Sequence, residues 1–68
     1  MDVKKVGSCL KRYRKRKGFS FTELKRMTGI SVMDLQLFED GLKEPTTQEL
    51  GKIADALDVP VAVLTQNV

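Results

Sequence analysis

The stretch SFTELKRMTGISVMDLQLFEDG, residues 20–41, decides the fold because it holds two short helices and the turn between them. Ser20 is followed three residues later by Glu23, the spacing of a capping box, in which each side chain accepts a hydrogen bond from the other residue's backbone N–H. Ser31 begins a second such pattern, with the acid Asp34 at the third position. The stretch therefore predicts two capped helices joined by a tight turn.

Glycines and apolar spacing define the ends and the inner faces of these two helices. Gly29 and Gly41 are expected to close them, because glycine readily adopts the positive φ of a helix C-terminus. Apolar residues at helical spacing predict the inner faces, namely Leu24 with Met27 and Leu35 with Phe38.

Helical patterns continue on both sides of this stretch. A first helix is expected from about Lys4 to Lys17, ended by Gly18, with a buried stripe of Val6, Leu10 and Tyr13. After it, Thr46 and Glu49 form a third capping-box pattern ahead of an apolar face made by Leu50, Ile53, Ala54 and Leu57. Pro60 opens a short last helix with Val61 and Leu64 turned inward. The chain is predicted to be one all-α domain, residues 1–68, of five short helices.

Composition excludes several classes of protein. A chain of 68 residues is near the lower limit for a domain that folds without disulfides or metals. With no His and only Cys9, no metal site, cofactor or internal disulfide is expected, although Cys9 could join two chains. No apolar run approaches the ~20 residues of a membrane span, and no signal-peptide core is present. We expect a cytoplasmic protein that is not an enzyme, since no nucleophile lies beside a base.

Charge is distributed unevenly along the chain. Residues 1–26 carry ten Lys/Arg and two acids, a net +8, whereas residues 27–68 carry two Lys and seven acids, a net −5. A basic half favours a polyanionic partner. A solvated helix face with one structural ion pair accounts for it equally well. The run KRYRKRK, residues 11–17, is expected to surround its helix as a collar because successive residues step round the cylinder.

The chain resembles the Xre family of phage-repressor and Cro-like helix-turn-helix domains. The resemblance covers residues 6–65 and implies a lambda-repressor-like fold with a central helix-turn-helix, whose second helix enters the major groove of double-stranded DNA. It rests on Val6-Gly7-x-x-Leu10, Arg14, Gly18-Phe19-Ser20, Leu24, Gly29-Ile30-Ser31, Leu35, Phe38-Glu39-x-Gly41, Pro45, Leu50, Ile53-Ala54, Leu57, Val59 and Leu64.

The resemblance also assigns residue roles. Arg14 and Glu39 are expected to form a partly buried structural ion pair, and a planar guanidinium suits a carboxylate partner. DNA-contacting residues are expected at the start of the motif, on its second helix and in the following loop. The groove-facing set is Ser31, Val32, Met33, Gln36 and Leu37, and the backbone set is Ser20, Phe21, Lys25 and Lys43.

Several of these positions depart from the family pattern. Phe21 stands where Gln is usual, Lys25 replaces a small packed residue, and Thr28 replaces an apolar one. Val32, Met33 and Leu37 cannot hydrogen-bond to base edges, although they can touch thymine methyl groups.

An alternative function follows from these departures. The fold could serve as a protein–protein interaction module, an antirepressor or adaptor, that binds a protein through an exposed apolar patch of Phe21, Val32, Met33 and Leu37. A further alternative is that Val32 or Met33 folds inward and repairs the packing disturbed by Lys25 and Thr28. Replacing Gln36 should change base preference only if DNA is the ligand.

The C-terminal residues Val63 and Val68 suggest a homodimer, because two apolar residues on the last helix could form a two-fold interface. Val63 could equally close the core of a monomer. The sequence does not identify an operator, an inducing signal or a partner protein, nor whether the chain belongs to a longer protein.

Overall fold

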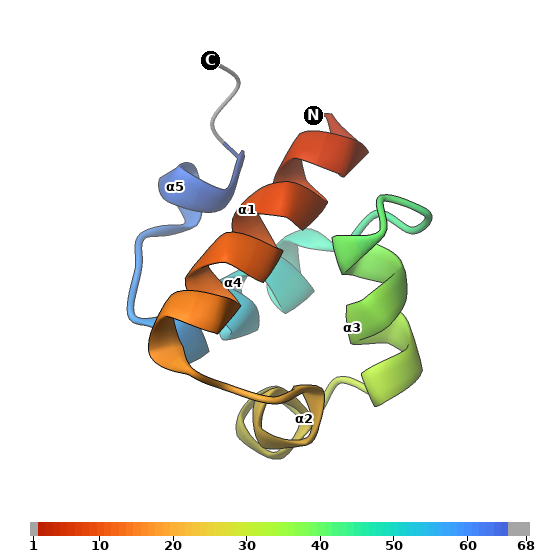
Figure 1. Cartoon of the computed structure of the whole chain (residues 1–68). Helices are drawn as coiled ribbons and strands as arrows, with labels where there is room; N and C mark the ends of the chain where they lie inside the picture. Colours follow the sequence, from red (N-terminus) through yellow and green to blue (C-terminus); the bar gives the residue numbers. More distant parts are fainter. Residues whose placement is uncertain (1, 66–68) are drawn as a thin grey trace.

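A computed structural model describes residues 2–65, which form five helices and contain no strand within that range (Figure 1). The helices are α1 Val3–Lys17, α2 Phe21–Thr28, α3 Val32–Glu39, α4 Thr47–Leu57 and α5 Val61–Thr65. The all-α, five-helix fold expected from the sequence is confirmed.

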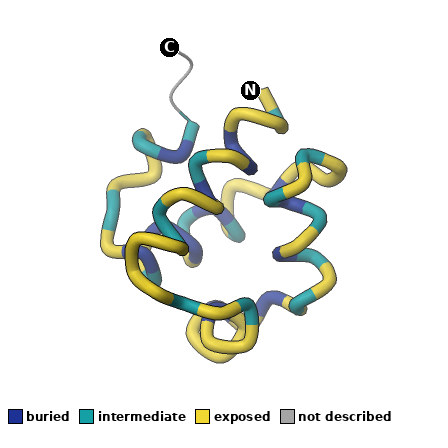
Figure 2. The backbone as a smooth tube through the Cα atoms, in the orientation of Figure 1, coloured by how far each residue is buried: buried dark blue, intermediate teal, exposed yellow. Residues whose placement is uncertain are grey.

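Helix α1 is the central element of the packing. It contacts α3 on one flank, α5 on the other and α4 behind it, while α2 lies below and packs on α3 and α4 (Figure 1). Buried residues gather on the inner sides of these helices (Figure 2). The side chains at the centre are those of Phe38, Ile53, Leu57 and Leu64, all fully buried. This core holds α2 and α3 against α1, so that one side of α3 remains outside.

Two of the three predicted capping boxes are confirmed. Ser20 Oγ accepts from Glu23 N at 3.1 Å, and a Glu23 carboxylate oxygen accepts from Ser20 N at 3.0 Å. The same reciprocal bonds join Thr46 and Glu49 at the start of α4. These boxes satisfy backbone donors that have no partner inside the helix.

The remaining predicted capping box, between Ser31 and Asp34, is wrong. Ser31 Oγ accepts from Asp34 N at 3.1 Å, but the return bond from the Ser31 N–H is absent from the cap. The Asp34 carboxylate instead lies 2.9 Å from Lys43 Nζ. Aspartate is one methylene shorter than glutamate, and here its carboxylate pairs with a cation on the following loop. Ser31 remains an N-cap through its own hydroxyl.

Two inward-facing assignments from the sequence are also wrong. Met27 is 52% exposed, because the buried side of α2 is formed by Leu24 and Thr28, one turn apart. Val61 is 39% exposed at the start of α5, where only Leu64 is fully enclosed. Both residues are apolar, but both lie on the solvent-facing side of a short helix.

Gly7 allows a close approach between α1 and α3. A Cβ atom added to Gly7 would meet the Phe38 carbonyl oxygen and lie 2.7 Å from the Glu39 carbonyl oxygen. A side chain of any size would push the helices apart, so glycine sets their separation. The spacing places the C-terminal end of α3 directly beside α1.

No helix within residues 2–65 combines the length and the apolar character that crossing a membrane requires.

Candidate nucleic-acid interface

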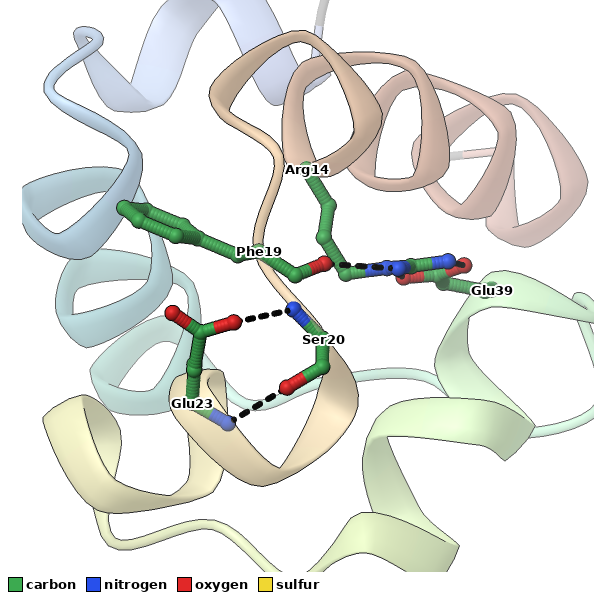
Figure 3. A network of polar contacts seen from close by, with 5 residues as sticks. All are labelled: Arg14, Phe19, Ser20, Glu23 and Glu39. Carbon is green, nitrogen blue, oxygen red and sulfur yellow. Dashed lines mark hydrogen bonds and ion pairs between the residues drawn. The ribbon is translucent and has the colours of Figure 1, made fainter.

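Arg14 joins three segments of the chain, namely helix α1, the loop before α2 and the end of α3 (Figure 3). Its Nε lies 2.6 Å from Glu39 Oε2 and its Nη2 lies 3.1 Å from Glu39 Oε1, a two-pronged ion pair at the end of α3. Its Nη1 donates to the Phe19 carbonyl oxygen at 2.9 Å, in the loop before α2. The side chains of Arg14 and Glu39 are only 13% and 6% exposed. The ion pair therefore connects α1, the loop and α3 in a largely dry environment.

Phe21, the first residue of α2, covers this ion pair. The Arg14 guanidinium carbon lies 4.3 Å from the centroid of the Phe21 ring, within the range of a cation–π contact. The ring is half-buried and packs against the core. Sequence reasoning missed this contact, because it depends on the angle at which α2 leaves α1.

The start of α2 carries a fixed negative charge at Glu23. Hydrogen bonds from the Ser20 backbone N–H and then from its hydroxyl hold the pKa of Glu23 below its ordinary value of 4.5, and the positive charge of Arg26 acts in the same direction. The ionised carboxylate is also favoured by the positive end of the helix dipole. Of the predicted residues here, Ser20 and Lys25 are exposed.

The outer side of α3 is less apolar than its sequence suggests. Met33 is 71% exposed, whereas Val32 and Leu37 are half-buried. The polar residues Ser31 and Gln36 are both exposed. With Phe21 also half-buried, the predicted apolar patch contains a single broadly exposed side chain. The surface that α3 offers is therefore a mixture of hydroxyl, amide and thioether groups.

Thr28 fits its buried position through hydrogen bonds. Its Oγ1 donates to the Leu24 carbonyl oxygen at 2.7 Å and accepts from the Ile30 N–H at 3.2 Å. A buried hydroxyl with both bonds made carries little penalty. The second of these bonds also fixes the turn between α2 and α3, so the departure from an apolar residue is compensated locally.

Lys43 lies in the loop after α3 and is paired with Asp34. Both side chains remain partly exposed, so the pair adds little to stability. It does bring the predicted backbone-contacting lysine next to the first turn of α3. Val63 is half-buried on α5, and Val68 lies outside the described residues. Within residues 2–65 no group of three or more His, Cys, Asp and Glu side chains could hold a metal ion.

A family model described as helix-turn-helix matches residues 10–64, which include the whole motif and its framing helices. This chain belongs to the Xre-like helix-turn-helix family. The resemblance seen in the sequence is thereby confirmed.

Named relatives of this Xre-like domain are regulators. It is 38% identical over 60 residues to the HTH-type transcriptional regulator SinR of Bacillus subtilis, and equally to SinR of Bacillus licheniformis. The match covers 87% of this chain and 54% of each relative, so the chain spans about half their length.

Solved structures agree with the family over nearly the whole chain. The restriction-modification controller protein C.AhdI of Aeromonas hydrophila superposes with a TM-score of 0.88 at 28% identity, covering 93% of this chain and 96% of that one. The clp gene regulator ClgR of Corynebacterium glutamicum superposes with a TM-score of 0.90 at 28% identity, covering 96% and 69%. The chain is thus a helix-turn-helix domain of the kind found in transcriptional regulators.

Proposed function

We propose that this domain binds double-stranded DNA as part of a transcriptional regulator, with the N-terminal half of α3 in the major groove. The observation that carries the proposal is the outward face of α3, where Ser31, Met33 and Gln36 are exposed on a helix held rigidly by Arg14 and Gly7. A motif of this geometry presents its second helix to the groove.

The exposed side chains divide into a reading group and a positioning group. The Gln36 amide can pair in two places with an adenine edge, Ser31 can reach a base or a phosphate, and Met33 can touch a thymine methyl group. Ser20, Lys25 and Lys43 would contact the phosphate backbone and position the helix. Val32 and Leu37 add apolar contact at the groove wall. With few polar readers, sequence-dependent DNA shape would supply part of the specificity.

The alternative, a protein-binding module, is the less favoured function. It requires a contiguous exposed apolar patch, and three of its four members (Phe21, Val32 and Leu37) are half-buried. Phe21 in addition is engaged with Arg14. A DNA ligand requires only the exposed residues that remain.

An amide chemical-shift titration with a mixed-sequence duplex at about 150 mM salt tests the proposal, since weak charge contacts are largely screened there. We expect shifts centred on Ser20, Phe21, residues 31–37 and Lys43. A response absent from residues 31–37 would contradict the proposal, and the α3 face should then be used to search for a protein partner.

Selection of binding sites from random duplexes gives a second readout. Gln36→Ala should relax base preference at one position and cost about 1–3 kcal/mol at the preferred base. Gln48→Ala is the matched control, because Gln48 is an exposed glutamine on α4. Equal selected sequences for the Gln36→Ala variant and the parent domain would remove Gln36 from the reading group.

A further inference from the structure

The outer side of α1 is a continuous cationic face that the reading helix does not use. At about 100° per residue, the side chains on this face fall within an arc of about 140° opposite Leu10. They are Lys4, Lys5, Ser8, Lys11, Arg12, Lys15 and Arg16, and α1 contains no acid between Val3 and Lys17. We call these residues the α1 face.

The collar expected from the run KRYRKRK is therefore wrong. Tyr13 and Arg14 are half-buried, because Tyr13 packs against the core and Arg14 binds Glu39. This leaves Lys11, Arg12, Lys15 and Arg16 on one side of the helix, whereas Lys17 lies on the other side and is paired with Asp58. The basic run, residues 11–17, therefore places most of its exposed charges on one face of α1.

Five of the six charged side chains of the α1 face form no ion pair within residues 2–65. Across residues 2–65, no carboxylate lies within 4.0 Å of the charged nitrogens of Lys4, Lys11, Arg12, Lys15 or Arg16. Two acids form ion pairs with α1, but they bind residues outside the α1 face: Glu39 binds Arg14 and Asp58 binds Lys17. The face thus presents like charges side by side, an arrangement that an external polyanion stabilises.

Two arginines on this face lie near the same aromatic ring. The guanidinium carbons of Arg12 and Arg16 lie 5.9 Å and 5.6 Å from the centroid of Tyr13. The ring limits the motion of both planar groups without cancelling their charge. A guanidinium with restricted motion loses less entropy when it binds, and its fork matches two phosphate oxygens.

The α1 face and the reading helix point in different directions. Helix α3 packs on the flank of α1 that carries Gly7 and Arg14, so the exposed side of α3 is turned away from α1 (Figure 1). The α1 face is centred on Ser8 and Arg12, opposite the buried residue Leu10. A duplex held by α3 would leave most of this face open.

We propose that the α1 face binds the phosphate backbone of a DNA duplex, independently of sequence and separately from the duplex read by α3. Lys4 and Lys15 are about 16 Å apart along the helix axis, and duplex DNA offers about one negative charge per 1.7 Å of its own axis. A second copy of the chain is a poorer occupant, because its acids are scattered over α2, α3, α4 and the segments beside them, and Asp34, Glu39 and Asp58 are already paired. This inference does not depend on the proposed function of α3.

The test uses a variant in which α3 docking is blocked. Met33→Asp places a negative charge on the outer side of α3 at a largely exposed position, so the fold should be retained. Titration of this variant with a 20-base-pair duplex of arbitrary sequence should still shift the amides of Lys11, Arg12 and Lys15. Absence of these shifts would overturn the inference.

The salt dependence of the DNA affinity then gives the number of phosphate contacts made by the α1 face. In the Met33→Asp background, Arg12→Gln/Lys15→Gln removes two charges from the α1 face. Each lost phosphate contact lowers the slope of log affinity against log salt by about 0.9. When the salt concentration rises from 50 to 200 mM, the Met33→Asp parent should therefore lose about 12-fold more affinity for DNA than the variant that also carries Arg12→Gln/Lys15→Gln.

The matched control is Lys52→Glu, which changes the net charge by the same amount at an exposed position on α4. It should leave the salt slope unchanged. Equal slopes for the parent and the α1 variant would overturn the inference. If DNA shifted the amide signals of α1 but not those of residues 31–37 in the unmodified domain, only the α3 proposal would be refuted.

Discussion

The ring of Phe21 lies against the guanidinium of Arg14, with 4.3 Å between the ring centroid and the guanidinium carbon. The same guanidinium donates two hydrogen bonds to Glu39 at the end of α3. The ring thus shields an ion pair from water on one side and fixes the direction in which α2 begins. This packing gives a structural reason for an aromatic residue at this position.

Replacing Phe21 with Leu should keep an apolar side chain but lose the cation–π contact. We expect a loss of about 0.5–2 kcal/mol in the free energy of unfolding, measured by urea denaturation. Phe19→Leu is the control, because Phe19 also packs on the core but contacts Arg14 through its carbonyl oxygen. A double-mutant cycle with Arg14 should give a coupling energy for Phe21 and none for the Phe19 ring. Zero coupling for both would remove the stacking argument.

Arg14→Ala should lower the free energy of unfolding by about 3 kcal/mol, because it leaves the Glu39 carboxylate buried without its partner. The Phe19 carbonyl oxygen would lose its donor as well. Arg12→Ala, on the exposed side of the same helix, should stay within about 0.5 kcal/mol of the parent. Thermal and urea unfolding of both variants make the comparison, and an unchanged melting temperature for Arg14→Ala would contradict it.

Gly7→Ala should destabilise the domain by about 1–3 kcal/mol even though alanine favours helix formation. The added Cβ would meet the carbonyl oxygens of Phe38 and Glu39 and force α1 from α3. Gly51→Ala on α4 is the opposite case, since no atom lies within 4 Å of its Cβ position. That substitution should stabilise by about 0.5–1 kcal/mol. If Gly7→Ala also stabilised the domain, helix propensity, and not packing, would dominate at Gly7.

The capping box at α2 should make stability depend on pH in the acidic range. The pKa of Glu23 is lowered below 4.5 in the fold, so its contribution is fully present above that value and is lost as the pH falls through the lower, folded pKa. Urea unfolding between about pH 3 and pH 7 should show the difference between the parent and Glu23→Gln narrowing at acidic pH. Glu44→Gln, in the α3–α4 loop, controls for the loss of one carboxylate. A constant difference would mean that the box does not require ionised Glu23.

The helices and two of the capping boxes could be predicted because their signals are local. A Ser or Thr three residues ahead of Glu specifies both bonds of the box within one turn, and this was sufficient at Ser20 and Thr46. Asp34 follows the same spacing, yet its carboxylate pairs with Lys43, nine residues away, which only the folded loop brings close. A cap at Asp2, whose Oδ1 accepts from Lys4 N and Lys5 N, was missed because the helix was expected to begin at about Lys4, one residue after its observed start at Val3.

The exposure of the candidate interface was harder to predict. On an eight-residue helix such as α2, few residues indicate which face is buried. Met27 was predicted inside because it is apolar, whereas Thr28 is the buried residue because its hydroxyl makes two hydrogen bonds in the core. Leu37 was expected outside, and Val32 either outside or folded inward; both are partly covered, whereas Met33 is exposed. The contact of Phe21 with Arg14 depends on the angle between two helices, which no spacing of residues specifies.

The bond between Lys43 and Asp34 gives any anion that contacts the loop after α3 an internal competitor. An anion that approaches Lys43 competes for the ammonium group with a carboxylate that is tethered to the same chain and is therefore present at high effective concentration. Because the pair is partly exposed and weak, the competition is mild. A ligand that is anchored at several other points would still overcome it more readily than a small anion, so the internal carboxylate favours extended ligands.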